Sequence, residues 1–151
     1  MEALDRYRDR DGMAVHHATS QHDKMLVVLD DDKFFLRTLS RAALKHRLIC
    51  IGCENVEDFF EATMYFSNAV ILIDQNLGLS KHLFNRPRYY QKGDQLLGLI
   101  DSQRVYLMSA DPKALLVAME HPDRIKGFIS KEIGVTNIIK FVTDIPLSRA
   151  K

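Results

Sequence analysis

The chain has 151 residues but only two cysteines, and it has no apolar run of the roughly 18 residues that a membrane span needs. Two cysteines cannot build the disulfide framework of a small secreted domain, so we expect a reducing compartment. The first residues, 1–24, lack the apolar core of a signal peptide. These absences argue against a membrane protein and favour a cytoplasmic one.

The sequence also lacks an excess of charge of either sign. Lysine and arginine number 21 and aspartate and glutamate number 20, which leaves a net charge of +1. A protein that binds the phosphate backbone of nucleic acids needs a clear cationic excess on at least one face. Direct DNA binding is therefore not expected, and the length of the chain predicts one domain.

Apolar runs alternate with helical periods from Lys24 onward. The runs that predict buried parallel strands are 25–29, 48–51, 69–73, 104–108 and 127–130. The segments between and after them predict helices over 33–46, 55–66, 94–100, 112–120 and 135–142. Asp32 and Asn55 are of the type that caps a helix N-terminus, and they precede the first two helices. This alternation predicts an α/β fold, a doubly wound five-stranded parallel sheet with helices on both faces.

The two ends of the chain fall outside this alternation. Residues 1–23 are polar and have no periodicity, which predicts a flexible N-terminal tail, and residues 148–151 form a short C-terminal end. The alternation occupies most of the chain, so the remainder is too short for a second domain within this sequence.

Polar residues stand at the carboxyl ends of the predicted strands, where ligands bind in sheets of this kind. Asp30 and Asp31 follow the first strand, Asp74 the third, Ser109 the fourth and Lys131 the fifth. Adjacent acids repel one another unless a cation neutralises them, and carboxylate oxygens suit Mg²⁺ or Mn²⁺. An aspartate that shares a site with a metal and an ammonium group is a plausible nucleophile toward a phosphoryl group.

Four segments carry these residues: VVLDDD (27–32), ILIDQN (71–76), YLMSAD (106–111) and GFISK (127–131). In these segments the sequence resembles the receiver domains of two-component response regulators, and the resemblance covers residues 24–147. It implies a flavodoxin-like (βα)5 fold and a role in phosphorelay signal transduction. A sensor histidine kinase or a histidine phosphotransfer protein would supply the phosphoryl group, and an effector protein would read the signal. Such a domain is not an enzyme beyond its own phosphorylation and dephosphorylation.

The resemblance implies a role for each matching residue in phosphoryl transfer. Asp74 would be the phosphoacceptor and Lys131 would pair with the phosphoryl group. Asp31 would hold Mg²⁺ directly and Asp30 would hold it through water. Asp74 and the backbone carbonyl of Asn76 would complete the protein ligands of the metal.

The resemblance also implies which residues switch the domain and set the lifetime of the phosphorylated state. Ser109 would move to hydrogen-bond the phosphoryl group, and Phe128 would turn inward into the space that this movement leaves. Asn76 and Asp111 would flank the line along which water attacks phosphorus, so both are candidates for tuning the lifetime.

Two features depart from the family pattern. Glu132 follows Lys131 where the family usually has a proline in a cis peptide bond, so we expect a differently shaped loop or a less firmly aimed Lys131. The segment 77–92 is longer than the roughly two to six residues of a typical strand-to-helix connection, and it contains no acid. It is a candidate partner-binding or homodimer-forming loop, an inert insertion, or less plausibly a stacking surface for single-stranded nucleic acid. Its candidate contact residues are Lys81, Phe84, Arg86, Arg88, Tyr89 and Tyr90.

Two other functions use the same residues. A haloacid-dehalogenase-like phosphatase would use Asp30 as the nucleophile of a D-x-D motif and would leave Asp74 idle. A receiver-shaped interaction module would carry the residues without ever being phosphorylated. Both remain alternatives to the phosphoacceptor at this point.

Overall fold

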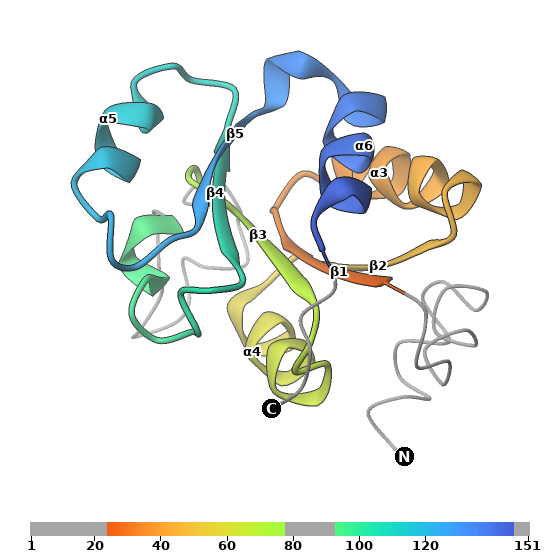
Figure 1. Cartoon of the computed structure of the whole chain (residues 1–151), viewed down its shortest axis with the longest axis horizontal. Coiled ribbons are helices and arrows are strands. Elements are labelled where there is room, and N and C mark those ends of the chain that lie inside the picture. The colour runs from red at the N-terminus through yellow and green to blue at the C-terminus, as the bar shows by residue number, and fades with distance from the viewer. Residues whose placement is uncertain (1–23, 78–92, 147–151) are drawn as a thin grey trace.

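The structure, a computed structural model, describes residues 24–77 and 93–146 of the chain. Its five strands form one parallel sheet in the order β2-β1-β3-β4-β5 (Figure 1). The strand order runs outward from β1 in both directions, so the topological switch point lies between β1 and β3. The strands are β1 (Lys24–Leu29), β2 (Leu48–Cys53), β3 (Val70–Asp74), β4 (Val105–Ser109) and β5 (Gly127–Ser130).

Helices cover both faces of this sheet, as predicted (Figure 1). One face packs against α3 and α6, and the opposite face packs against α4 and α5. No helix of the described residues is long and apolar enough to cross a bilayer. The helices are α3 (Lys33–Lys45), α4 (Val56–Tyr65), α5 (Ala114–Met119) and α6 (Val135–Asp144), with short 3-10 helices η3 (Gly93–Leu96) and η4 (Lys131–Ile133).

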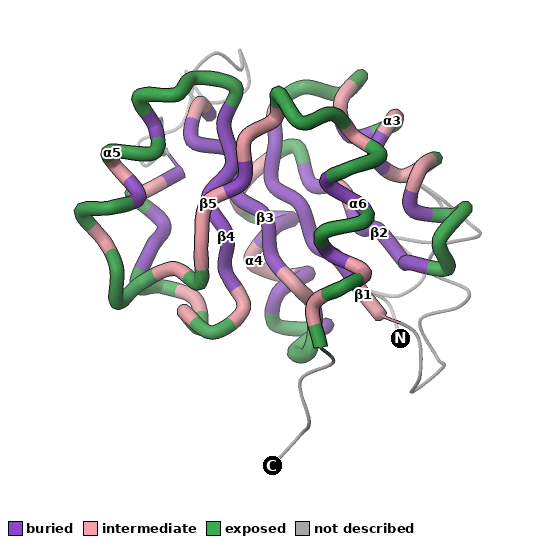
Figure 2. Tube along the Cα trace, turned by 45° about the horizontal axis from the view of Figure 1, so that its top comes forward, coloured by how far each residue is buried: buried purple, intermediate pink, exposed green. Residues whose placement is uncertain are grey.

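The central strand β1 shows why its sequence is an uninterrupted apolar run. Leu26 and Val28 face the α3 and α6 layer, whereas Val27 and Leu29 face the α4 and α5 layer. All four side chains are buried, and Figure 2 shows the strands as the buried centre of the molecule. A strand with helices on both sides has no polar face, so the alternation of polar and apolar residues is lost.

The two predicted helix caps are confirmed. The carboxylate of Asp32 accepts a hydrogen bond from the backbone N–H of Phe35 at 3.1 Å, at the start of α3. The side-chain oxygen of Asn55 accepts one from the backbone N–H of Asp58 at 2.8 Å, at the start of α4. Each bond satisfies an N–H that has no partner inside its helix.

The predicted helix over 94–100 is wrong. The chain forms only the 3-10 helix η3, and turns follow it, so the described residues contain four α-helices rather than the five of a (βα)5 pattern. Gly98 has a φ of +91°, a left-handed conformation that interrupts any continuing helix. The helix predicted over 112–120 is also shorter, because α5 begins at Ala114 and ends at Met119.

Candidate functional site

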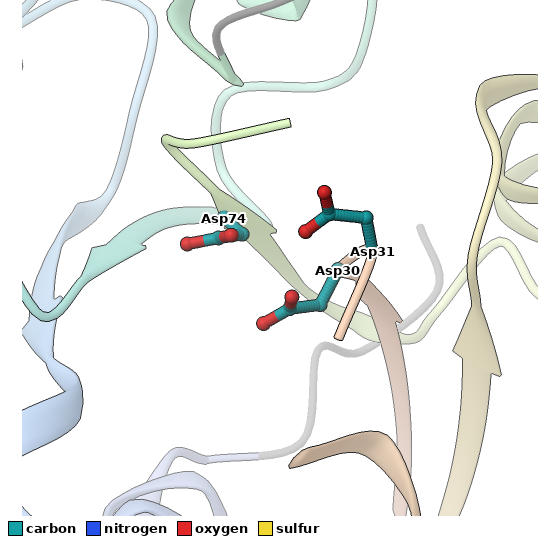
Figure 3. Close-up of side chains that lie close together, drawn as sticks. All are labelled: Asp30, Asp31 and Asp74. Atoms are coloured by element: carbon teal, nitrogen blue, oxygen red, sulfur yellow. The ribbon is translucent and has the colours of Figure 1, made fainter. Parts of the chain in front are cut away.

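Three carboxylates meet at the carboxyl edge of the sheet, at the switch point. β1 and β3 pair in parallel with Leu29 opposite Ile73, so the next residues, Asp30 and Asp74, emerge side by side. With Asp31 they form a cluster in which one oxygen of each carboxylate lies within 4.8 Å of the others (Figure 3). Parallel pairing therefore brings together the acids that the sequence places after different strands, as predicted.

Lys131 joins this cluster from the end of β5. Its Nζ lies 2.6 Å from Oδ2 of Asp30 and 3.2 Å from Oδ1 of Asp74, and 4.5 Å from the ring centroid of Phe35. The lysine begins η4, in which Glu132 occupies the next position, and no peptide bond of the described residues is cis. The loop is thus a trans turn at Glu132, and Lys131 still reaches both aspartates.

Burial and mutual repulsion govern the protonation of this cluster. Burial, together with the negative charge of Asp30, raises the pKa of Asp74 to about 7, although Lys131 acts in the opposite direction. The same two causes raise the pKa of Asp31. Burial alone would lower the pKa of Lys131, but its contacts with Asp30 and Asp74 outweigh burial and raise it. One ammonium therefore does not neutralise three neighbouring carboxylates.

The cluster fits a hard divalent cation. Oδ1 of Asp30 accepts a hydrogen bond from the backbone N–H of Asp32 at 2.9 Å, but the buried Oδ2 has no hydrogen-bond partner among the described residues. The ammonium of Lys131 lies 2.6 Å from this atom and pairs with its charge. A buried oxygen without a hydrogen bond, beside two further carboxylates, is the all-oxygen donor set that Mg²⁺ prefers.

The predicted hydroxyl lies on the neighbouring strand. Ser109 ends β4, is 1% exposed, and accepts a hydrogen bond through Oγ from the backbone N–H of Asp111 at 3.0 Å. The exposed Asp111 uses its own carboxylate to accept from the backbone N–H of Lys113 at 2.9 Å. The start of the segment that leads into α5 is therefore held by two local side-chain bonds.

Two other predicted residues are half-buried. Phe128 lies on β5 and packs against the core on the α4 and α5 side of the sheet. Asn76 lies two residues beyond Asp74, at the same edge of the sheet. The candidate contact residues of the 77–92 segment all lie outside the described residues.

One contact directly beside Asp74 was not predicted from the sequence. A Cβ on Gly93 would lie 2.4 Å from the carbonyl oxygen of Asp74, so only glycine fits at this position. Gln75, the residue after Asp74, is buried and hydrogen-bonded to Asp94. The one signal in the sequence was Gln75 itself, an uncharged polar residue between Asp74 and Asn76, which both have predicted roles.

Comparison with solved structures places this fold among response-regulator receiver domains. A receiver domain protein from Clostridium thermocellum is 12% identical with a TM-score of 0.59, covering 80% of this chain and 92% of that one. The signal receiver domain of NarL from Mycobacterium tuberculosis is 24% identical with a TM-score of 0.59, covering 81% and 94%. A Burkholderia pseudomallei response regulator, solved with a phosphorylated aspartic acid and a calcium ion, is 18% identical with a TM-score of 0.58, covering 78% and 65%.

No protein-family model matches the sequence, and no curated protein is similar to it. The similarity to the solved structures is thus one of fold, at low sequence identity. The chain has the flavodoxin-like fold of receiver domains, which confirms the fold predicted from the sequence.

Proposed function

We propose that this chain is a phosphoacceptor receiver domain of a two-component system, and that Asp74 takes the phosphoryl group. The observation that carries the proposal is the position of Lys131, whose ammonium contacts both Asp74 and Asp30 beside the third carboxylate of Asp31. A phosphohistidine of a sensor kinase or of a phosphotransfer protein is the donor. A similar fold with a phosphorylated aspartic acid, that of the Burkholderia pseudomallei response regulator, supports this chemistry.

In the transfer step, a carboxylate oxygen of Asp74 forms a bond to phosphorus while the P–N bond to the donor histidine breaks. The ring nitrogen keeps the electron pair of that bond and takes a proton. Lys131 stabilises the charge on the phosphoryl oxygens. Asp30, Asp31, Asp74 and the backbone carbonyl of Asn76 would hold Mg²⁺ or Mn²⁺, and the bound ion would neutralise phosphoryl oxygens and favour ionised Asp74.

Phosphorylation switches the β4 and β5 side of the domain. The phosphoryl group adds nearly two negative charges and three acceptor oxygens next to Ser109. The Ser109 hydroxyl, which now accepts from the amide of Asp111, turns to donate to the phosphoryl group. Phe128, half-buried in this state, turns inward as the segment after β4 moves. Asn76 and Asp111 set how readily water reaches phosphorus.

The signal then leaves the domain through a partner. In this proposal residues 24–147 form the receiver, and a separate effector protein or domain reads the changed face in the cytoplasm. A second copy of the chain is one form that such a partner takes. Size analysis with and without beryllofluoride and Mg²⁺ tests for the second copy. Measurements of Mg²⁺ affinity and of a beryllofluoride-induced change test phosphorylation itself, and no response to either would contradict the proposal.

Phosphorylation with a small donor identifies the nucleophile. Acetyl phosphate and Mg²⁺ should add one phosphoryl group, detected by intact mass, as an acid-labile adduct. We expect Asp74→Asn to abolish the adduct and Asp30→Asn only to slow its formation. The reverse pattern, with the adduct lost in Asp30→Asn and kept in Asp74→Asn, would instead indicate a haloacid-dehalogenase-like phosphatase.

A further inference from the structure

Gln75, the residue that follows Asp74, is held by four hydrogen bonds. Its backbone N–H donates to the carbonyl of Met108 at 2.8 Å, and its carbonyl accepts from the N–H of Gly93 at 2.9 Å. Its side-chain Nε2 donates to Oδ1 of Asp94 at 2.7 Å, and its Oε1 accepts from the N–H of Asp94 at 2.9 Å. Gln75 is buried and Asp94 is half-buried, so solvent competes only weakly for these bonds.

The backbone of Gly93 thereby lies directly against the backbone of Asp74, the proposed phosphoacceptor. A Cβ on Gly93 would lie 2.4 Å from the carbonyl oxygen of Asp74 and 2.8 Å from the side chain of Ile73, so the two backbones are in direct contact. We call Gln75, Gly93 and Asp94 the clamp. The clamp joins the end of β3 to the start of η3, immediately beside Asp74.

The clamp stands where a longer helix was expected. Only the four-residue 3-10 helix η3 begins at Gly93, so little regular structure packs beside the end of β3 at the clamp. The second oxygen of Asp94 lies 3.8 Å from Nε2 of His121, just beyond α5, so the clamp lies beside the α5 side of the sheet. The Asp74–Gln75 peptide is thus held by the backbone bonds of Gln75 and, beside them, by the double side-chain hydrogen bond to Asp94.

We propose that Gln75 and Asp94 are positioning residues for phosphoryl transfer, because their double hydrogen bond aims Asp74 at the incoming phosphorus. This inference rests on the proposed function. Neither residue touches the reacting atoms, and each acts through the backbone of Asp74. Misplacing a reacting group by about 1 Å can slow a reaction about 100-fold, so small shifts at this peptide matter.

A cycle of two substitutions tests the hydrogen bond itself. Gln75→Glu places two carboxylates against each other where Nε2 now donates to Asp94. Asp94→Asn keeps the bond, because its amide oxygen accepts from Gln75. The double variant restores the side-chain bond with the donor and acceptor exchanged, and it keeps the bond from the backbone N–H of residue 94, at the net charge of the natural chain. Gln75→Met breaks both bonds without changing the charge.

The readouts are the maximal rate of phosphorylation by acetyl phosphate and, separately, the affinity for Mg²⁺. We expect Gln75→Glu and Gln75→Met to lower the maximal rate about 10- to 100-fold. Asp94→Asn and the double variant should stay within about threefold of the natural chain. All rates are taken at saturating Mg²⁺, because Gln75 lies between Asp74 and Asn76, two of the proposed ligands, and its variants are expected to weaken Mg²⁺ binding as well. Asn55→Ala is the control for lost stability, because it removes the α4 cap and should leave the rate unchanged.

Each alternative outcome overturns a defined claim. If the natural chain is phosphorylated and Gln75→Glu reacts as fast, the clamp does not position Asp74 and the proposed function stands. If the double variant stays as slow as Gln75→Glu, the exchanged hydrogen bonds are not the cause and the inference fails. If the rate falls equally in Asn55→Ala, the effect is one of stability and the inference also fails. If the natural chain takes no phosphoryl group, the proposed function and the inference fall together.

Discussion

At the amino edge of the sheet cationic side chains bind backbone carbonyls, whereas at the carboxyl edge carboxylates crowd around Lys131. Lys24, at the start of β1, donates to the carbonyls of Val142, at 3.4 Å, of Thr143, at 2.6 Å, and of Ile145. Arg104, just before β4, donates to the carbonyls of Phe66 and Ala69 at 3.1 and 3.3 Å. The carbonyl of Ala69 lies just before β3, and the other carbonyls stand at the ends of α4 and α6, so the cations bind mainly at the ends of helices.

The carboxyl edge is arranged in the opposite way. Asp30, Asp31 and Asp74 are closer to one another than their charges favour, and one buried oxygen lacks a hydrogen bond. Burial raises the pKa of Asp74 and Asp31 at this edge, and burial lowers the pKa of Lys24 and Arg104 at the other. At the amino edge, the half-buried cations Lys24 and Arg104 hold neighbouring elements together. At the carboxyl edge, the negative charge of the aspartates is only partly neutralised, as is typical of a ligand-binding site.

The largest expected effect comes from removing the cation of the carboxyl edge. Lys131→Met should slow phosphorylation by acetyl phosphate about 100-fold, because no ammonium remains to stabilise the phosphoryl oxygens. It should also lower the free energy of unfolding by about 3 kcal/mol without Mg²⁺, because Asp30 is left buried and unpaired. Rates come from intact mass over time, and stabilities from urea unfolding.

The exposed Lys140 on α6 provides the matched control, since Lys140→Met removes the same charge outside the site. We expect that control to change neither the rate nor the stability appreciably. Equal losses in the two variants would mean that net charge, not the contact with Asp30 and Asp74, accounts for the effect.

A smaller effect of opposite sign is expected from Asp74→Asn. The native state holds the proton of Asp74 up to a pKa of about 7, above the ordinary 3.8, so ionising this group costs stability as the pH rises through that range. Without Mg²⁺, Asp74→Asn should therefore stabilise the protein measurably at pH 8 and change its stability little at pH 4. Urea unfolding at the two pH values measures this, with the exposed Asp123→Asn as control. A gain independent of pH would show that repulsion among ionised carboxylates is not the cause.

The convergence of the acids could be predicted because parallel strands end at a common edge. The sequence places Asp30, Asp74 and Lys131 directly after apolar runs, and the parallel sheet brings the ends of those runs to one edge. The clamp could not be predicted in this way. Gln75 and Asp94 are 19 residues apart across a segment without periodicity, and nothing in the sequence aligns them. The predicted helix over 94–100 failed because Gly98 adopts a left-handed conformation, which periodicity does not show.

The smallest expected effect lies at the amino edge and completes the comparison. Lys24→Met removes the donor that closes the C-terminal end of α6, and hydrogen bonds to a charged group are worth about 1.5 kcal/mol or more. We expect a loss of about 1.5 kcal/mol in urea unfolding and no change in the phosphorylation rate, because Lys24 lies at the opposite end of β1 from Asp30. The exposed Lys45→Met is the control and should leave both unchanged. A slower phosphorylation in Lys24→Met alone would mean that the two edges are coupled, and the division between a structural edge and a reactive edge would fail.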